Sequence, residues 1–428
     1  MPGTTTDRVF IGDNLAWLGS AYAEPDAYDV IYIDPPYNTG SSFSYDDDRD
    51  DWDDWFEERL AGIRRVMRDD AALFVSIDDA KLIETCIACD RVFGRQNRVG
   101  IMITHQAMRS NARHINVVHE YVVAYAKDKR RLPRMSVRRI DTDDARVIRR
   151  LEASVSDALS AGASTEDAQG RLRKEIRAVL DDDPDALWVR NYRCVSDDGR
   201  VFFPKDLSVP GTPAPLDIDD IGMHLPALPT RRWSSEAKMR RLHADKRIAY
   251  LDGRPYEIQY IEESRNAIPS ILPFYSRQGT EELKRLGCAG LFDTPKPVGL
   301  IELLFMSLAE GRQGMRVLDC FAGSGTTAQA AYEASGRLGI PVRWDLVQLD
   351  EPMAKGSRPE RVARSLGIAP TIPEALLYRI EAYRKAAGVS RPYDVFRMGN
   401  DDTVTGDAGG NDMTGNAGGD AQTASPAR

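Results

Sequence analysis

The sequence predicts an α/β protein with a largely parallel central sheet, and three stretches support this prediction. Residues 30–33 (Val-Ile-Tyr-Ile) and 71–77 are mostly apolar runs, typical of strands that are buried on both faces. Residues 316–319 predict a third strand, which a glycine turn and a helix over 328–334 follow. A strand, a tight turn and a helix in this order are typical of the βα units that build parallel sheets.

The remaining elements are expected on both sides of a long middle segment. Each is assigned from its apolar spacing and from the turn residues that flank it. Strands are expected at 8–13, 98–104, 121–125 and 344–349. Helices are expected at 14–23, 53–67, 80–93, 298–310 and 372–387. Residues 141–183 carry apolar side chains at intervals of four and predict an αα-hairpin, whereas residues 185–290 are rich in turns.

Two prolines end the predicted strand at residues 30–33, in the sequence Asp34-Pro35-Pro36-Tyr37. Proline cannot continue a sheet ladder, so this loop is expected at the carboxyl edge of the sheet, where α/β proteins bind ligands. A carboxylate and a rigid carbonyl can each accept one N–H from an aromatic amine, and an aromatic ring can stack on its flat base. Asp34, the Pro35 carbonyl and Tyr37 supply these three groups. An ordinary Pro-Pro turn is the alternative for the four residues alone.

A glycine-containing loop follows the predicted strand at 316–319. Gly323 and Gly325 let the backbone approach a ligand closely, and the helix start behind them offers free N–H groups. A single G-x-G does not identify a nucleotide, and the chain has no G-x-x-x-x-G-K-[ST] loop for a nucleoside triphosphate. An acid at the end of the next strand, Glu351 or Asp350, is well placed for ribose hydroxyls.

The two loops together, and in this order, resemble the β class of S-adenosylmethionine-dependent DNA amino-methyltransferases. The resemblance is strongest to the modification subunits of type III restriction-modification systems, in which the motif order is circularly permuted. It covers residues 8–385. The motifs that carry it, besides DPPY at 34–37 and FAGSGTT at 321–327, are Gly12-Asp13-Asn14-Leu15, His119-Glu120-Tyr121-Val122, Gly199-Arg200, Thr294-Pro295-Lys296-Pro297 and Val347-Gln348-Leu349-Asp350-Glu351.

The resemblance implies a Rossmann-like methyltransferase sheet that moves a methyl group from S-adenosylmethionine to the 6-amino group of adenine in DNA. The catalytic residues it implies are Asp34, Pro35, Pro36 and Tyr37. The cofactor-binding residues it implies are Asp34, Lys296, Asp319, Phe321, Ala322, Gly323, Ser324, Gly325, Thr326, Asp350 and Glu351. Lys296 is expected near the methionine carboxylate, and Glu351 matches the ribose-binding acid better than Asp350. His119 and Glu120 are both left out of the catalytic set, because a structural hydrogen bond explains them equally well.

The chain is expected to divide into four parts. Residues 1–127 (with DPPY) and 291–398 (with FAGSGTT) form the two halves of one methyltransferase domain, and residues 128–290 form an inserted helical and target-recognition region. Residues 399–428 contain almost no large apolar side chains, so they cannot bury enough surface to order themselves. A disordered tail is therefore predicted there.

Charge is distributed unevenly along the chain, whose formal net charge is −9. Residues 91–150 hold 15 Lys and Arg against 5 Asp and Glu, a local balance of +10. This stretch, including a polar and basic loop at 108–114, is the expected contact with the phosphates of double-stranded DNA. A solvated surface is the alternative for the same charges.

Several alternatives and expectations accompany this prediction. Asp rather than Ser at position 34 favours adenine by family likeness. The alternatives are cytosine-N4 methylation and a non-catalytic DNA-binding specificity subunit of a restriction complex. RNA or a protein side-chain amide is a less favoured substrate. The chain has no Pro-Cys sequence that could supply a nucleophile, which argues against methylation at carbon 5 of cytosine. A homodimer is expected, with a restriction subunit as a possible partner, although the chain is short for a type III modification subunit.

The composition bears on metals, membranes and location. Cys86-Ile87-Ala88-Cys89 lies in a predicted helix without a second pair or a nearby histidine, so core positions are expected and no metal site. No apolar run approaches the roughly 20 residues of a membrane span, and five cysteines without a framework suggest a reducing compartment. A cytoplasmic location without membrane contact is expected.

Overall fold

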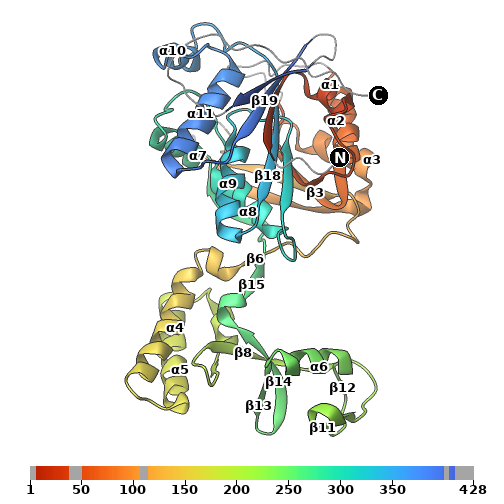
Figure 1. Cartoon of the computed structure of the whole chain (residues 1–428), viewed down its shortest axis with the longest axis vertical. Coiled ribbons are helices and arrows are strands. Elements are labelled where there is room, and N and C mark those ends of the chain that lie inside the picture. Colours follow the sequence, from red (N-terminus) through yellow and green to blue (C-terminus); the bar gives the residue numbers. More distant parts are fainter. Residues whose placement is uncertain (1–5, 38–50, 107–113, 400–403, 410–428) are drawn as a thin grey trace. The chain divides into compact units, whose positions relative to one another are not determined.

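The structure is a computed structural model, and it divides into two compact units that are described separately (Figure 1). Unit 1 comprises Met1–Ser136 and Ala267–Arg428, and unit 2 comprises Val137–Asn266. Residues 6–37, 51–106 and 114–399 are described in full, and residues 404–409 by their backbone. The basic loop predicted at 108–114 lies, except for His114, outside these residues.

A ten-stranded sheet forms the centre of unit 1, in the order β16-β4-β5-β3-β2-β17-β18-β1-β19-β20. Its strands are β1 (Asp7–Ile11), β2 (Tyr28–Ile33), β3 (Met67–Ile77), β4 (Arg98–His105), β5 (His119–Ala126), β16 (Ile271–Tyr275), β17 (Met315–Asp319), β18 (Val342–Gln348), β19 (Tyr393–Met398) and β20 (Val404–Gly409). β5 and β20 pair with their neighbours in antiparallel fashion, and the other pairings are parallel. The prediction of a largely parallel sheet is confirmed.

The strand order makes β2 and β17 direct neighbours, although the insert separates them in the sequence. Val317 pairs with Val30 and Leu318 with Ile31. Because the two strands are parallel, the loops that leave their carboxyl ends emerge at the same edge of the sheet. The DPPY loop and the glycine loop are these two loops.

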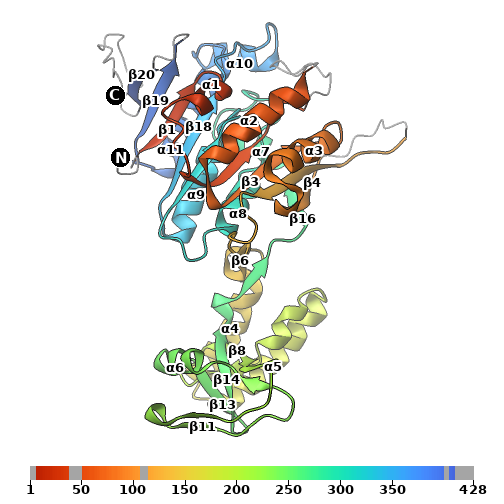
Figure 2. The same cartoon turned by 90° about the vertical axis from the view of Figure 1, so that its right-hand side faces the viewer.

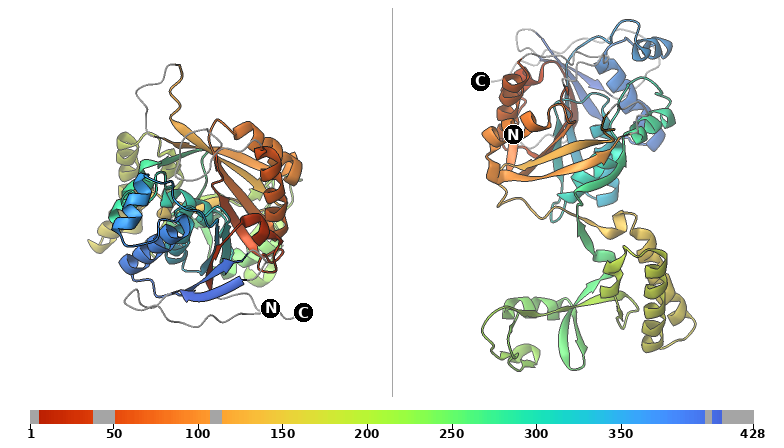
Figure 3. Two further views of the ribbon diagram at one scale, coloured as in Figure 1. Left: turned by 90° about the horizontal axis from the view of Figure 1, so that it is seen from above. Right: turned by 180° about the vertical axis from the view of Figure 1, so that it is seen from behind.

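Helices cover both faces of the sheet, as Figures 2 and 3 show. On one face lie α1 (Asn14–Gly19), α2 (Trp52–Val66) and α3 (Leu82–Phe93), and their apolar sides join β2 and β3 in one core cluster. On the other face lie α8 (Val298–Ser307), α9 (Thr326–Leu338) and α11 (Ile372–Ala387). The helices α7 (Arg277–Arg285) and α10 (Arg358–Ser365) pack with α11 around a smaller cluster. Cys89 is buried in the larger cluster and Cys86 packs against it, so the expected core positions are confirmed.

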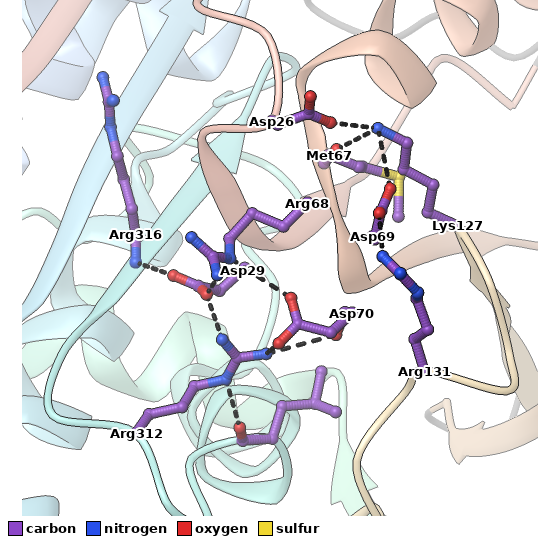
Figure 4. A network of polar contacts seen from close by, with 11 residues as sticks. Asp26, Asp29, Met67, Arg68, Asp69, Asp70, Lys127, Arg131, Arg312 and Arg316 are labelled. Atoms are coloured by element: carbon purple, nitrogen blue, oxygen red, sulfur yellow. Dashed lines mark hydrogen bonds and ion pairs between the residues drawn. The ribbon is translucent and has the colours of Figure 1, made fainter.

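Ion pairs join the two halves of unit 1 at the edge of the sheet opposite the two loops (Figure 4). The carboxylate of Asp29, in β2, accepts a hydrogen bond from the backbone N–H of Arg316 at 2.7 Å. The Arg312 guanidinium contacts the carboxylates of Asp29 and Asp70, the latter at 3.0 Å, and Arg68 lies 3.3 Å from Asp29. Each of these contacts to Arg312 or Arg316 links residues from opposite sides of the insert.

Unit 2 contains an αα-hairpin and several short strands. The hairpin of α4 (Ala145–Ser160) and α5 (Thr165–Asp182) confirms the helical prediction for 141–183, and the two helices bury a shared cluster. The other elements are β7 (Cys194–Val195), β8 (Val201–Asp206), β9 (Ser208–Val209), β10 (Leu216–Ile218), β11 (Met223–Leu225), β12 (Arg232–Trp233), α6 (Glu236–Ala244), β13 (Ile248–Leu251) and β14 (Arg254–Tyr260). Strands β13, β14, β8 and β7 form the largest sheet of this unit.

The remaining elements are short. The chain passes between the units at β6 (Ser136–Arg138) and β15 (Arg265–Ala267), which pair with each other. The 3-10 helices are η1 (Arg95–Asn97), η2 (Arg139–Asp141), η3 (Leu187–Asn191), η4 (Asp219–Ile221) and η5 (Ile261–Glu263). No helix within the described ranges combines the length and the apolar character needed to cross a lipid bilayer.

Three predicted boundaries differ from the structure. Unit 2 spans fewer residues than the predicted insert 128–290, because β16 belongs to the sheet of unit 1 and α7 packs with its helices. The first helix ends at Gly19 instead of residue 23, since the Ser20 hydroxyl donates to the Trp17 carbonyl at 2.7 Å and Ser20 is extended. The tail prediction for 399–428 is wrong at residues 404–409, which form β20 beside β19; residues 400–403 and 410–428 are outside the described part.

Candidate active site

A cavity of about 400 Å³ lies at the carboxyl ends of β2 and β17. Most of the site residues predicted from the sequence line it. They are Asp34, Pro36, Lys296, Asp319, Phe321, Ala322, Gly323, Ser324, Thr326 and Glu351. Pro35, Tyr37, Gly325 and Asp350 do not line it, and Asp350 is exposed to solvent. The structure therefore brings both predicted loops to one cavity.

The DPPY loop is fixed by contacts of its side chains and backbone. The Tyr37 hydroxyl donates to the Asp34 carboxylate at 2.9 Å, and the Trp52 indole donates to the Pro36 carbonyl at 3.0 Å. Burial raises the pKa of Asp34 above its ordinary value, and the nearby Lys296 ammonium opposes this rise. Asp34 is thus held at the rim of the cavity as a hydrogen-bond acceptor.

The glycine loop is shaped by two residues with a left-handed backbone. Gly323 has φ +48° and Gly325 has φ +73°, backbone angles that residues other than glycine rarely adopt. Gly325 is also the N-cap of α9, so the helix starts directly at the loop. The Gln348 side chain accepts the Gly323 N–H at 2.7 Å and so supports the turn.

Asp319 ends β17 and holds the start of the glycine loop. Its carboxylate accepts the Phe321 N–H at 3.0 Å and the Thr327 hydroxyl at 2.5 Å. Burial raises the pKa of Asp319 to about 7, although these two hydrogen bonds oppose the rise. Asp319 is therefore a structural anchor whose charge depends on pH near neutrality.

The raised pKa of Asp319 predicts how stability varies with pH. An acid that binds its proton more tightly when folded makes the free energy of unfolding fall as pH rises from about 4 to about 7. Asp319→Asn, which carries no charge, is expected to flatten this decline while an amide oxygen still accepts the Phe321 N–H. Urea unfolding of both proteins across this range measures the difference, and parallel curves would contradict the prediction.

Lys296 contacts two carboxylates and a hydroxyl beside the DPPY loop. Its ammonium is 2.7 Å from the Glu120 carboxylate and 3.4 Å from the Asp34 carboxylate, and it donates to the Tyr37 hydroxyl. It lines the cavity from the side of the DPPY loop. Glu120, which was not among the predicted site residues, thus contacts the site. The signal in the sequence that could have indicated this was its place in the family motif 119–122, at the start of β5.

Arg59 and Asn14 also line the cavity, although neither was among the predicted site residues. Arg59, on α2, donates to Asn14 at 2.6 Å and to Asp13 at 3.1 Å, and its guanidinium stacks 4.2 Å from the Trp55 ring. Asn14 in turn donates to the Cys320 carbonyl at 2.8 Å. The start of α1 is therefore tied to the beginning of the glycine loop.

Arg379, on α11, supports the glycine loop from behind. Its fully buried guanidinium donates to the Ser324 carbonyl at 2.9 Å and to the Gln329 side chain at 3.1 Å. Burial lowers the pKa of Arg379 to about 10. Arg379 was not among the site residues predicted from the sequence.

Acidic groups outnumber basic ones around the cavity. Its wall contains five acidic residues, Asp13, Asp34, Asp293, Asp319 and Glu351, against Arg59 and Lys296. Such a wall favours a ligand that carries positive charge. Within the described residues, no group of three or more His, Cys, Asp or Glu side chains has the arrangement of a metal site.

The chain is similar to several known proteins. A family model described as DNA methylase (N6_N4_Mtase) matches residues 28–347. The EcoP15I Mod subunit of a type III restriction-modification enzyme from Escherichia coli is 28% identical over 389 residues, which cover 80% of this chain and 58% of that protein. The type II methyltransferase M.KpnI from Klebsiella pneumoniae is 26% identical over 370 residues, 82% of each chain.

Among solved structures, the PvuII DNA methyltransferase, described as cytosine-N4-specific, aligns over 90% of this chain and 94% of its own. The TM-score is 0.40 and the sequence identity 12%. The chain thus spans little more than half the length of the type III relative and most of the length of the type II relative.

Proposed function

We propose a function from the premise that this chain belongs to the DNA methylase family. The proposed reaction transfers a methyl group from S-adenosylmethionine to the 6-amino group of adenine in DNA. The observation that carries this proposal is the pairing of β2 with β17, which brings Asp34 and the glycine loop to one cavity. A donor and an acceptor held in one cavity can react without a covalent enzyme intermediate.

The cavity fits the proposed cofactor in size and charge. Its volume of about 400 Å³ lies in the range of small-molecule sites. S-adenosylmethionine carries a sulfonium and an ammonium group against one carboxylate, and the excess of acidic residues in the wall suits this net positive charge. Phe321, Gly323 and Glu351 hold the cofactor in this proposal, and when bound it supplies an activated methyl group.

The DPPY residues orient the amino group that receives the methyl. Asp34 and the Pro35 carbonyl accept its two N–H groups, which favours a pyramidal nitrogen, and Tyr37 stacks on the base. The target base must leave the duplex to reach the cavity. Alignment of amine and methyl group within one cavity accounts for most of the acceleration, because a bimolecular step becomes effectively unimolecular.

The DNA partner, the specificity and the assembly are also proposals. Unit 2 recognises the DNA sequence, and the basic residues of 91–150 contact phosphates. Asp at position 34 favours adenine over cytosine. A homodimer and a pairing with a restriction subunit, suggested by the type III relatives, remain predictions that sedimentation of the chain alone and with a candidate partner tests.

One experiment tests the reaction and the base together. The purified chain is incubated with duplex DNA and S-adenosylmethionine carrying a labelled methyl group, and the digested nucleosides are identified by mass spectrometry. Label in N6-methyladenine supports the proposal, whereas label in N4-methylcytosine supports the cytosine alternative. Cofactor binding without methylation of any DNA supports the non-catalytic alternative.

The contact between Arg379 and the glycine loop yields a prediction for cofactor affinity. Arg379→Met removes the partner of the buried Ser324 carbonyl, and an unsatisfied buried acceptor costs about 1–3 kcal/mol. We expect the affinity for S-adenosylmethionine to fall on the order of tenfold, measured by isothermal titration calorimetry. Arg397→Met, at an exposed ion pair on β19, is the control and should leave the affinity unchanged. Equal affinities for all three proteins would refute the role of Arg379.

A further inference from the structure

Three charged side chains from three separate elements meet beside the DPPY loop. Asp34 follows β2, Glu120 lies in β5, and Lys296 precedes α8. The Lys296 ammonium is 2.7 Å from Glu120 and 3.4 Å from Asp34, and the side chains of Lys296 and Glu120 are only 12% and 14% exposed. Glu120 is held on its other side by the Gln106 amide, which donates to its second carboxylate oxygen.

This arrangement raises a conflict with the proposed reaction, on which the present inference rests. The target amino group must donate a hydrogen bond to Asp34 and lie beside Tyr37. The Lys296 ammonium already lies within 3.4 Å of the Asp34 carboxylate and donates to the Tyr37 hydroxyl. A free ammonium there would compete with the amine for Asp34.

We propose that Glu120 is a positioning residue for methyl transfer, because its carboxylate holds the Lys296 ammonium and so leaves Asp34 to the amino group of the target base. The distances agree with this division, since Lys296 is closer to Glu120 than to Asp34. Lys296 lowers the pKa of Glu120 below its ordinary value even though burial opposes this, which keeps Glu120 ionised as the partner of the ammonium.

Charge gives a second reason for a carboxylate at position 120. Methyl transfer moves positive charge from the sulfonium to the nitrogen of the base. Asp34, Glu120 and Lys296 together present one net negative charge to that nitrogen, whereas Asp34 and Lys296 alone would present none. Fixed charges of this kind act strongly in a site that excludes water.

The inference differs from the role that the family resemblance implied for Lys296, which was contact with the methionine carboxylate of the cofactor. The two roles predict opposite results when both side chains are changed. If Lys296 binds the cofactor, its removal harms the enzyme in every background. If Lys296 is a competitor that Glu120 restrains, its removal helps an enzyme that lacks the Glu120 charge.

The test compares the full chain with Glu120→Gln, Lys296→Met and the double variant. Single-turnover methylation of duplex DNA gives the rate, calorimetry gives the affinity for S-adenosylmethionine, and thermal unfolding verifies that each variant is folded. Glu374→Gln, at an exposed ion pair of α11, is the matched control for loss of an acid. Because neighbouring residues are compared, the double variant measures their coupling directly.

We expect Glu120→Gln to lower the rate on the order of tenfold or more with the cofactor affinity within threefold of the original. The double variant should then be several-fold faster than Glu120→Gln, a rescue that a merely structural role of Glu120 would not produce. A double variant as slow as Glu120→Gln, or a tenfold loss of cofactor affinity in Lys296→Met, would overturn the inference alone. Failure of the unmodified chain to methylate DNA would overturn the proposed function, and the inference with it.

Discussion

Asp34→Ala is expected to lower the rate of methyl transfer on the order of 10²–10³-fold or more, a loss comparable to that from removing one preorganised hydrogen-bond partner of a transition state. Asp34 lies at the rim of the cavity and is the only side-chain carboxylate of the DPPY loop. Without it, the proposed acceptor of one N–H of the amine is lost, and no carboxylate of that loop opposes the positive charge that develops on nitrogen. In the proposed function the cofactor is held mainly by the glycine loop and Glu351, so its affinity should stay within a few fold.

The measurement separates chemistry from binding. Single-turnover methylation gives the rate, and calorimetry with S-adenosylmethionine gives the affinity of the same preparation. Asp34→Asn retains a hydrogen-bond acceptor without the charge and should lie between Asp34→Ala and the unmodified chain. Asp54→Ala, at an exposed position in the first turn of α2, controls for the loss of an aspartate. An Asp34→Ala protein that methylates DNA at the original rate would remove Asp34 from the proposed mechanism.

The sequence was sufficient to predict the sheet and the meeting of its two loops. Strands such as β2 and β17 carry continuous apolar runs, and the loops after them contain Pro-Pro or paired glycines, whose backbone restrictions are local. Local signals of this kind need no knowledge of the partner strand. The meeting of the two loops followed from the family resemblance, whereas the pairing of β2 with β17 was not predicted, since periodicity alone does not order strands in a sheet.

The residues that the sequence analysis missed are positioned by partners distant in sequence. Arg379 lies on the buried side of α11 between Leu376 and Tyr383, so a charged residue at an apolar spacing was the available signal. Arg59 occupies the equivalent place on α2 between Phe56 and Ile63. In both helices the periodicity indicated a core position, but only the fold shows which polar atoms each guanidinium reaches.

The strand β20 shows that a low content of apolar side chains does not by itself predict disorder. Residues 404–409 carry few apolar side chains, which predicted disorder. An edge strand is held by its backbone hydrogen bonds, and β20 pairs along its whole length with β19. A poor apolar content excludes an independent core, but it does not exclude addition of a strand to an existing sheet.

A buried ionic cluster around Asp345 joins the two halves of unit 1. Asp345, in β18, accepts hydrogen bonds from Arg8 at 2.8 Å, from Arg316 at 2.9 Å and from the Tyr28 hydroxyl. The side chains of Arg8 and Asp345 are 5% and 2% exposed. These contacts join β1 and β2 of the first half to β17 and β18 of the second. The cluster therefore links parts of the sheet that the insert separates in the sequence.

Asp345→Ala is therefore expected to lower the free energy of unfolding by about 3–5 kcal/mol, because it leaves the buried Arg8 guanidinium without this carboxylate and removes one of the carboxylates that Arg316 contacts. Urea unfolding at neutral pH measures the loss. Glu374→Ala removes an acid from an ion pair whose side chains are 33% and 47% exposed, and it should cost no more than about 1 kcal/mol. Equal losses in the two variants would show that the buried cluster does not hold the halves together.

The same variant has a pH dependence of known sign. Burial opposes ionisation of Asp345, but Arg8 and Arg316 outweigh it and hold the pKa of this carboxyl below its ordinary value. An acid with a lowered pKa in the folded state stabilises the protein above the ordinary pKa of about 4, and this contribution is lost as pH falls further. The difference in unfolding free energy between the unmodified chain and Asp345→Ala should thus be constant at neutral pH and shrink below pH 4. A difference that grows on acidification would mean that Asp345 is protonated in the folded protein, and the two halves would then be joined by something other than this ionic cluster.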